Sequence, residues 1–331
     1  MRIKEEASCR VCGGPIGRRF PVDEFLFGRC PRCGTIGKIL TEAEYRNLPV
    51  TYDPGVELGE LPEEELRSFF DLDTKKAILL RLAGADERPG EGKGLIRLLD
   101  IGCGMGGYLI AARDLGFAAD GIEPSESHSR IGRDRFGLRI DTRYFDPSSA
   151  GENRYDIIIL SHVIEHIYDQ KAFLAGIYRI LAPGGVIFIA TPNAASTIAG
   201  MGGRSWSMLK PVDHVGLLTP AAMKLLIPSG ADSRIETTEN SWEPFVAFCS
   251  SCRNLLRDFR RRGLAKKAGG APPPALAKRN SFRATKARIN SLRMFRFFAK
   301  MISFPCHVFD VQSGRAACLV CEIRRPAGGS G

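Results

Sequence analysis

A glycine-rich turn between two apolar strands constrains the fold of this chain more than any other feature. Residues 98–123 read LLDIGCGMGGYLIAARDLGFAADGIE, which predicts a strand, a turn, a helix and a second strand ending at Glu123. Gly102, Gly104 and Gly106 allow the backbone to turn sharply and to approach a ligand closely, and the helix that follows points its amide dipoles at the turn. An acid about 20 residues beyond the turn can accept hydrogen bonds from both hydroxyls of a ribose. These residues predict a nucleoside-binding site.

The glycine spacing alone does not separate two classes of cofactor, because Gly102, Gly104 and Gly107 also satisfy the dinucleotide-binding pattern. Asp100 favours S-adenosylmethionine over a dinucleotide. At the end of the strand its carboxylate can face the cationic amino group of S-adenosylmethionine, whereas it would repel a pyrophosphate. The segment resembles the first motif of the class I S-adenosylmethionine-dependent methyltransferases, acid-x-Gly-x-Gly-x-Gly, here Asp100, Gly102, Gly104 and Gly106.

The resemblance continues downstream. Residues 155–169, YDIIILSHVIEHIYD, and residues 173–193, FLAGIYRILAPGGVIFIATPN, resemble the fourth strand, next helix and fifth strand of one branch of that family. This branch includes ubiquinone-biosynthesis O-methyltransferases and many sugar and natural-product methyltransferases. Residues 213–230 resemble the loop and helix that follow, so the likeness covers about residues 96–241 plus a closing strand near 316–324. It implies an α/β fold with a doubly wound Rossmann-like sheet, and S-adenosylmethionine as cofactor.

The ligand pocket of such a sheet lies beyond the carboxyl ends of its parallel strands. Thr191 ends the fifth strand and is expected at this edge. After the third strand the branch often has an acid near the adenine amino group, but this chain has Tyr144 or Phe145 there, which leaves adenine contacts other than stacking undetermined. The residues expected to bind the cofactor are Asp100, Gly102, Cys103, Gly104, Gly106, Glu123, Pro124, Ser161 and His162.

Three of the five histidines, His162, His166 and His214, lie in segments expected near the cofactor and are the candidate catalytic bases. A histidine with a pKa of about 6.5 can take a proton from a hydroxyl as the methyl group moves. Asp213 precedes His214 and can orient it. The alternative is that Glu165 and His166 only begin or stabilise the helix and loop after the fourth strand. Methyl transfer itself requires little from side chains, because alignment can supply most of the rate.

Four of the ten cysteines form two Cys-x-x-Cys pairs near the N-terminus, Cys9 with Cys12 and Cys30 with Cys33, each followed by glycine. The two-residue spacer lets both thiolates of a pair face one ion, and the 17 intervening residues suffice for a hairpin. These pairs predict a structural zinc ribbon. Four thiolates complete the coordination, so the ion would stabilise the fold and would not activate water. Similar ribbons precede the methyltransferase domain in many members of the branch.

Two further pairs, Cys249 with Cys252 and Cys318 with Cys321, lack the following glycine. The second pair lies in an expected strand, where residues three apart point to opposite faces of the sheet. Buried, unreactive thiols are therefore predicted in place of a second metal site.

The order of motifs predicts a modular chain. Residues 63–82 alternate charged and apolar side chains as one helix packed on the sheet would. Strands at about 96–101, 119–123, 156–160 and 185–190 alternate with helices, which is typical of a doubly wound parallel sheet. The expected organisation is a zinc ribbon at 1–40, a connector and covering helix at 41–94, the cofactor-binding core at 95–252, a basic helical insertion at 253–304, the closing strand of the core at 305–325 and a flexible tail at 326–331.

The net charge of +10 is concentrated in one segment. Residues 253–300 contain fifteen Lys or Arg and one acid, Asp258, so the rest of the chain is net negative. Within them, residues 280–302 predict a basic amphipathic helix with Phe295 and Phe298 on its apolar side. Such a helix can pack as a lid on the domain, lie on an anionic membrane surface, or bind nucleic acid. The first two roles can coexist and are favoured over the third.

Length and composition suit a full α/β core with an added module, since 44% of the 331 residues are hydrophobic. No signal-length or membrane-spanning apolar run is present, which predicts a cytoplasmic protein, peripheral to the inner face of the membrane if the basic helix binds lipid. The sequence thus predicts an S-adenosylmethionine-dependent methyltransferase that O-methylates a small molecule or glycan. The alternatives are an RNA methyltransferase, supported by the ribbon and the basic segment but without a base-specific motif, and a non-catalytic binding or regulatory module with a vestigial cofactor site.

Overall fold

The computed structural model of the chain describes residues 8–48, 62–84, 94–147, 155–209, 212–238 and 315–327. Three expectations lie outside these residues. They are the basic insertion at 253–304 with its amphipathic helix at 280–302, the pair Cys249 and Cys252, and most of the connector after the ribbon.

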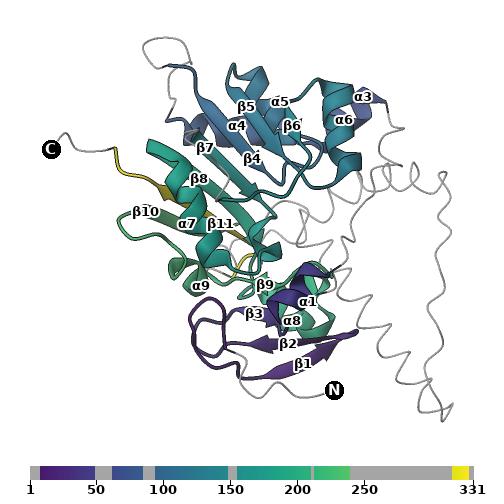
Figure 1. The fold of residues 1–331 in the computed structure, drawn as a ribbon, viewed down its shortest axis with the longest axis vertical. Helices are drawn as coiled ribbons and strands as arrows, with labels where there is room; N and C mark the ends of the chain where they lie inside the picture. Colours follow the sequence, from purple (N-terminus) through teal and green to yellow (C-terminus); the bar gives the residue numbers. More distant parts are fainter. Residues whose placement is uncertain are drawn as a thin grey trace.

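The larger sheet of the described residues has seven strands in the order β10-β11-β8-β7-β4-β5-β6 (Figure 1). Strands β6, β5, β4, β7 and β8 are parallel, and β11 lies antiparallel between β8 and β10. The predicted α/β Rossmann-like sheet is therefore confirmed, with one antiparallel strand near its edge. The strand bounds are β4 Arg97–Ile101, β5 Ala118–Ile122, β6 Ile140–Asp141, β7 Tyr155–Ser161, β8 Leu181–Pro192, β10 Asp232–Thr238 and β11 Cys318–Arg324.

Helices cover both faces of this sheet, as the buried runs in its strands require. In β7, Ile157 and Ile159 pack on one face, and Ile158 and Leu160 on the other. The first face is covered by α3 (Glu63–Phe69), α4 (Leu72–Leu82), α5 (Gly107–Asp114) and α6 (Glu126–Phe136), and the second by α7 (Gln170–Ile180) and α9 (Pro220–Lys224).

The single helix predicted for residues 63–82 is wrong, because the chain forms α3 and α4 with a break between them. Asp71 has φ 48°, in the left-handed region that a continuous helix does not allow. The four predicted strands are confirmed as β4, β5, β7 and β8, with β8 extending further at both ends.

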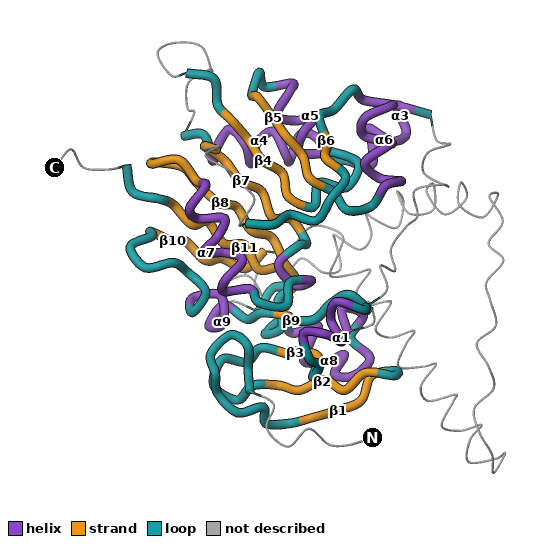
Figure 2. The backbone as a smooth tube through the Cα atoms, viewed as in Figure 1, coloured by secondary structure: helices purple, strands orange, loops and turns teal. Residues whose placement is uncertain are grey.

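A smaller four-stranded sheet contains the N-terminal hairpin (Figure 2). Strands β1 (Arg19–Val22) and β2 (Phe25–Arg29) form the expected hairpin between the two cysteine pairs, and β3 (Ile36–Lys38) follows them. The fourth strand, β9 (Gly216–Leu217), comes from the segment between β8 and α9. The ribbon is thus joined to the larger domain by backbone pairing that the sequence did not predict.

Shared apolar clusters reinforce this junction. Phe27 and Ile36 of the ribbon pack in one cluster with Trp206 and Leu217. Figure 1 shows α1 and α8 beside the small sheet. No helix among the described residues has both the length and the apolar character needed to cross a bilayer. The remaining helical elements are α1 (Glu42–Arg46), α8 (Thr197–Gly202), η1 (Ile164–His166), η2 (Gly203–Ser205) and η3 (Ser207–Leu209).

Candidate cofactor site and active site

The glycine turn follows β4 and bends the chain into α5. Gly102, Gly104 and Gly106 have φ of 71°, 54° and 91°, which side chains rarely adopt. A Cβ at Gly102 would lie 2.5 Å from Val163 Cγ2, and one at Gly106 would lie 2.2 Å from Leu138 Cδ1. A Cβ at Gly104 would meet nothing within 4 Å. A side chain at Gly102 or Gly106 would therefore have to displace a neighbouring side chain, whereas Gly104 faces open space.

Two carboxylates flank the turn at the ends of adjacent strands. Asp100 in β4 is 2% exposed; burial raises its pKa well above the ordinary value, although the charge of Lys75 opposes this shift. Glu123 directly follows β5, and its Oε2 and Oε1 accept hydrogen bonds from the N–H groups of Gly104 and Ser125, both at 2.8 Å. Glu123 thus fixes the turn, and each of its oxygens has a second lone pair that can accept from a hydroxyl.

The other predicted cofactor residues lie around these two acids. The strand register aligns Ile101 of β4 with Leu160 of β7, so the chain after β7 leaves the sheet beside the glycine turn. Ser161 and His162 lie there. Pro124 is exposed directly after Glu123. The thiol of Cys103 is buried, and burial together with the two nearby carboxylates raises its pKa, which gives it no nucleophilic role.

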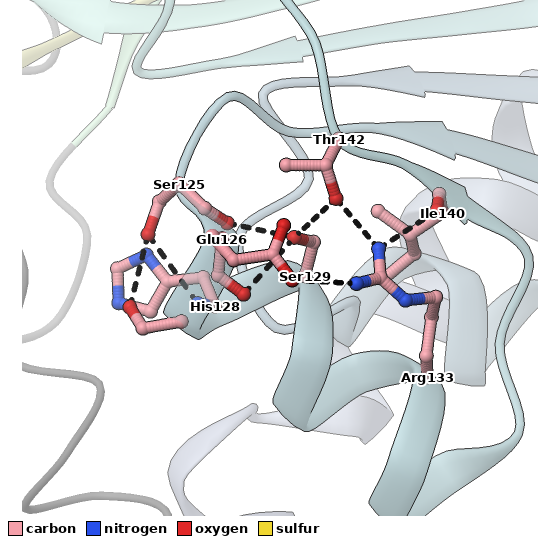
Figure 3. A network of polar contacts seen from close by, with 8 residues as sticks. Ser125, Glu126, His128, Ser129, Arg133, Ile140 and Thr142 are labelled. Atoms are coloured by element: carbon pink, nitrogen blue, oxygen red, sulfur yellow. Dashed lines mark hydrogen bonds and ion pairs between the residues drawn. The ribbon is translucent and has the colours of Figure 1, made fainter.

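A polar network fixes the segment that follows β5 (Figure 3). The Ser125 hydroxyl caps α6 by accepting from the His128 N–H at 3.3 Å. The hydroxyls of Ser129 and Thr142 lie 2.8 Å apart, and Arg133 donates to Thr142 at 2.6 Å. These contacts hold the chain immediately after the second acid against the chain that follows β6, so one wall of the site is pre-formed.

His162 lies in a strained conformation at the end of β7. Its φ of 58° is in the left-handed region, which is uncommon for residues other than glycine and clusters at functional sites. Its Nδ1 lies 3.3 Å from Oε1 of Glu165, which is fully buried, and Glu165 Oε2 accepts a 2.9 Å hydrogen bond from the Thr191 hydroxyl. A buried carboxylate therefore orients a histidine whose side chain is 38% exposed.

The other two candidate bases form a second group. His166 Nδ1 lies 3.3 Å from Asp213 Oδ2. The rings of His166 and His214 pack edge to face, with 4.7 Å between their centroids. His214 Nδ1 lies 2.8 Å from the carbonyl oxygen of Met208. The expectation that Asp213 orients its sequence neighbour His214 is therefore wrong. The carboxylate of Asp213 faces His166, and His214 is directed at a backbone acceptor.

The charges in this group are strongly coupled. Burial would raise the pKa of Glu165, but the close contact with His162 and the charges of the three histidines hold this pKa at about 2. Burial lowers the pKa of His214. Burial also opposes charge on His166, yet Asp213 and Glu165 outweigh it and raise the pKa of His166. Ligand atoms of Glu165, His166 and His214 lie within 4.8 Å of one another, a donor set compatible with a divalent cation.

The four ribbon cysteines gather at one point as free thiols. The sulfurs of Cys9, Cys12, Cys30 and Cys33 all lie within 4.8 Å of one another, with 3.6 Å between Cys9 and Cys33 and 3.4 Å between Cys12 and Cys30. A tetrahedral zinc site with Zn–S bonds of about 2.3 Å has sulfur–sulfur edges of about 3.8 Å. The cluster therefore has the size and the donor set of a four-thiolate zinc site.

The two cysteine pairs have matching backbone geometry. Gly13 donates to the carbonyl of Cys9 at 2.8 Å, and Gly34 donates to that of Cys30 at 2.9 Å, with φ of 68° and 76° at the two glycines. Burial opposes ionisation of Cys30, but backbone N–H groups and the thiol of Cys12 hold its pKa at about 7. The glycine after each pair is thus explained by the turn, as the sequence predicted.

Cys318 and Cys321 lie in β11 and are both buried. Cys321 packs in the cluster beneath α7. Burial raises the pKa of Cys321 to about 12. Both thiols of the pair are buried, as predicted, and their lack of reactivity stays a prediction.

Lys75 of α4 is a site residue that the sequence reasoning missed. Its charge acts on Asp100, and its Nζ lies 5.2 Å from the centroid of the Tyr108 ring. The signal was present in the sequence, because Lys75 interrupts the buried stripe that Leu72, Leu79 and Leu82 form at helical spacing.

Comparison with known proteins shows what the chain is similar to. A family model described as "Methyltransferase domain" matches residues 66–227. A ubiquinone biosynthesis O-methyltransferase of Caulobacter vibrioides is 36% identical over 119 residues, which cover 33% of this chain and 45% of that protein. One from a Methylobacterium species is 25% identical over 175 residues, covering 50% and 70%. A solved S-adenosylmethionine-dependent methyltransferase from Archaeoglobus fulgidus gives a TM-score of 0.42 at 16% identity, over 77% of this chain and 94% of that one.

Residues 66–227 are thus similar to the methyltransferase-domain family, and the relatives support its class I S-adenosylmethionine-dependent branch. The curated relatives that it matches include ubiquinone biosynthesis O-methyltransferases, and it spans about half the length of the first of them. The resemblance drawn from the glycine turn and the strands that follow it is confirmed.

Proposed function

We propose that this chain transfers the methyl group of S-adenosylmethionine to a hydroxyl oxygen of a small molecule or glycan. The observation that carries the proposal is the array of Thr191, Glu165 and His162 beside the glycine turn. It provides an oriented imidazole where a methyl donor would bind. The relatives that are named O-methyltransferases support an oxygen acceptor.

The residues of the turn fit the cofactor. The amino group would face Asp100, the ribose hydroxyls would be accepted by Glu123, and the open space at Gly104 would let the ligand approach the backbone. When bound, the cofactor supplies a methyl group on a sulfonium, which is a good leaving group. The protein's remaining task is to align the acceptor and to remove its proton.

His162 is the favoured base among the three candidates. A proton on Nδ1 directed at Glu165 makes Nε2 the nitrogen that accepts the acceptor's proton, and the buried carboxylate stabilises the imidazolium that results. His166 and His214 are directed by Asp213 and by a backbone carbonyl, so we assign them to the wall of the acceptor site.

We further propose that Cys9, Cys12, Cys30 and Cys33 hold a structural zinc ion. Free thiols in a metal-ligand arrangement suit a reducing compartment, which supports a cytoplasmic location. This proposal also includes the boundaries given above for the ribbon, the core and the insertion. It further includes contact of residues 280–302 with a membrane.

The test uses S-adenosylmethionine with a labelled methyl group and three acceptor pools: phenolic small molecules, saccharides and RNA. We expect label in one of the first two pools. His162→Asn, whose side chain tolerates the left-handed backbone, should slow transfer at least about 100-fold, a much larger effect than its effect on the affinity for S-adenosylmethionine. Label in RNA alone would overturn the small-molecule or glycan acceptor. Failure of the intact protein to bind S-adenosylmethionine would overturn the activity itself.

A further inference from the structure

A cavity of about 270 Å³ lies at the junction between the ribbon and the larger domain. Its walls come from the first cysteine pair, from the segment around β3, and from Tyr168, Gln170 and Gly216 of the core. The described residues that line it include two cations, Arg10 and Lys38, and no aspartate or glutamate. The cavity therefore carries net positive charge, and neither the fold nor the proposed methyl transfer accounts for it.

Lys38 directs its own charge out of the cavity. Its Nζ donates a hydrogen bond to the carbonyl of Val212 and lies 4.0 Å from the centroid of the Phe25 ring, and neither of these residues lines the cavity. The positive charge that the cavity offers to a ligand is therefore that of Arg10.

The guanidinium of Arg10 is held in a fixed orientation. Its Nη1 donates to the carbonyl of Lys38 at 3.1 Å, and its Nη2 donates to the carbonyl of Val215 at 2.7 Å. Its Cζ lies 4.6 Å from the centroid of the Tyr168 ring, and that ring packs against Tyr45 with 5.3 Å between the centroids. Such a stacked guanidinium loses little further entropy when it binds a ligand.

The partners of Arg10 in these contacts are all neutral. In the part of the chain that the structure describes, Arg10 forms no ion pair with a carboxylate. A guanidinium has five N–H donors, and the two carbonyls take two of them. A partly buried cation of this kind is stabilised by an anion that accepts its remaining donors, and carboxylate and phosphate groups match its planar geometry.

The alternative is that Arg10 only offsets the charge of the ribbon thiolates, because it lies between Cys9 and Cys12 in sequence. The hydrogen bonds do not favour this. The described contacts of the four sulfurs are with one another and with the Thr35 hydroxyl, whereas both donors of Arg10 go to carbonyls. The guanidinium is therefore directed away from the proposed zinc ligands.

We infer that this cavity binds a small oxyanion, a carboxylate or a phosphate group, on the guanidinium of Arg10. The volume suits a ligand smaller than a drug-sized molecule. Gly37 keeps the guanidinium accessible, because a Cβ at this position would lie 3.6 Å from Nη2 of Arg10. The inference does not rest on the proposed methyl transfer.

A bound anion would also strengthen the junction. The same guanidinium holds the Val215 carbonyl, and Val215 N–H donates to the carbonyl of Glu165 at 2.9 Å. A ligand on Arg10 would thus be bound by the folded junction and by no unfolded chain, so it should raise the unfolding midpoint as its concentration rises.

The inference is tested by calorimetric titration of the full chain, supplied with zinc, at constant ionic strength. The probes are inorganic phosphate, benzoate and benzamide, of which the last two have nearly the same shape and differ in charge. Phosphate, benzoate or both should bind, and benzamide should bind at least about tenfold more weakly than the anion that binds. The same anion should raise the unfolding midpoint by about 2–4 °C at ten times its dissociation constant.

Three variants locate the binding. Arg10→Met keeps an aliphatic stem on Tyr168 and should abolish the response to the anion. Gly37→Ala retains Arg10 and places a methyl group against Nη2, so it should weaken the anion several-fold in a folded protein. Arg133→Met is the matched control and should bind as the unaltered protein does. Arg133 also donates to a backbone carbonyl, that of Ile140 at 3.2 Å, but it pairs with Glu126 and lies outside the cavity.

Each result decides the inference. Anion binding that is lost in Arg10→Met, weakened in Gly37→Ala and kept in Arg133→Met supports it, and the probe that binds identifies the oxyanion. Absence of binding by both anions in the unaltered protein, or equal binding of benzoate and benzamide, overturns it. If Arg10→Met does not fold, Gly37→Ala decides alone, and an unchanged affinity in that variant would mean that the anion binds elsewhere. Affinity for S-adenosylmethionine, measured in the same samples, tests the proposed function separately.

Discussion

Gly37 of the ribbon and Gly216 of the methyltransferase core are paired residues of one antiparallel sheet. Gly216 lies two residues after His214, and the residue between them, Val215, is held from two sides. Its carbonyl accepts from the Lys38 N–H at 3.1 Å and from the Arg10 guanidinium at 2.7 Å. Its N–H donates to the carbonyl of Glu165 at 2.9 Å. The ribbon thus supports the backbone that carries a wall of the proposed acceptor site.

Removal of the proposed zinc ion should therefore impair catalysis as well as stability. We expect that chelation, or Cys30→Ser, lowers the thermal unfolding midpoint and slows methyl transfer, because β9 loses its partner strand. Affinity for S-adenosylmethionine should change much less, since the glycine turn is held by β4, β5 and β7. Scanning fluorimetry measures the unfolding midpoint and calorimetry measures the affinity for S-adenosylmethionine, each with and without added zinc.

Cys318→Ser is the control for the zinc prediction. This cysteine is buried in β11, so the variant should keep a full equivalent of zinc in a metal assay. Unchanged methyl transfer by the fully chelated protein would contradict the support that we assign to the ribbon.

Substitutions of Gly104 and Gly106 should differ in their effects on cofactor binding and on stability. Gly104→Ala should cost about 1–2 kcal/mol of unfolding free energy from its positive φ and should weaken S-adenosylmethionine binding at least about tenfold, because the new methyl group enters the open space of the site. Gly106→Ala should destabilise the fold more, by roughly 2–4 kcal/mol, since its Cβ also meets Leu138. Urea unfolding and ligand titration separate the two effects.

Gly116→Ala is the matched control for these glycine variants. Its φ is 79° and its Cβ would meet nothing within 4 Å, as at Gly104, but it ends α5 at the opposite end from the turn. It should reproduce the loss of stability of Gly104→Ala and leave cofactor affinity unchanged. Equal affinities of Gly104→Ala and the unaltered protein would show that the ligand does not pass over the turn.

Local patterns predicted the parts of the fold that depend on neighbouring residues. The acid at 100, the alternating glycines and the acid at 123 are within one strand-turn-helix-strand unit, so their spacing fixes where they meet. The Cys-x-x-Cys pairs were equally informative, because each turn is set by its own glycine.

Local sequence patterns could not predict contacts between segments that are far apart in the sequence. Strand β9 has two residues and no periodic signal, and the connector and most of the core separate it in sequence from its partner β3. The contact of Asp213 with His166 depends on how the chain after β8 folds back over η1, which spacing does not reveal. Asp213 and His214 were adjacent in sequence, and the assumption that adjacent residues interact produced the wrong pair.

The pair of Asp213 and His166 should make stability depend on pH in a defined window. Burial opposes both charges, but each partner outweighs it: the pKa of Asp213 is lowered and that of His166 is raised. The pair is therefore charged and stabilising between these two pKa values. Its contribution is lost as the pH falls through the lowered pKa of Asp213 and as the pH rises through the raised pKa of His166.

Asp213→Asn should accordingly reduce the free energy of unfolding by about 1 kcal/mol near pH 5.5 and by less near pH 9. Urea unfolding at the two pH values measures this difference. Histidine NMR titration should also show a lower pKa for His166 in the variant. Asp141→Asn, which disrupts an exposed contact with Arg143, should show neither change. A loss of stability that is equal at both pH values would contradict the ionic origin of the effect.

Glu165 should act as a positioning residue whose charge matters more than its shape. Glu165→Gln keeps the volume and can still accept from the Thr191 hydroxyl, but it removes the negative charge that faces His162. We expect kcat to fall about 10- to 100-fold, while KM for S-adenosylmethionine stays within about twofold, because Glu165 does not contribute to the glycine turn. Thr191→Val keeps the charge and removes one hydrogen bond, so it should cost about 1 kcal/mol of stability with a smaller loss of kcat. If Glu165→Gln raised KM for S-adenosylmethionine and left kcat unchanged, Glu165 would serve the cofactor site, and the assignment of His162 as the base would lose its support.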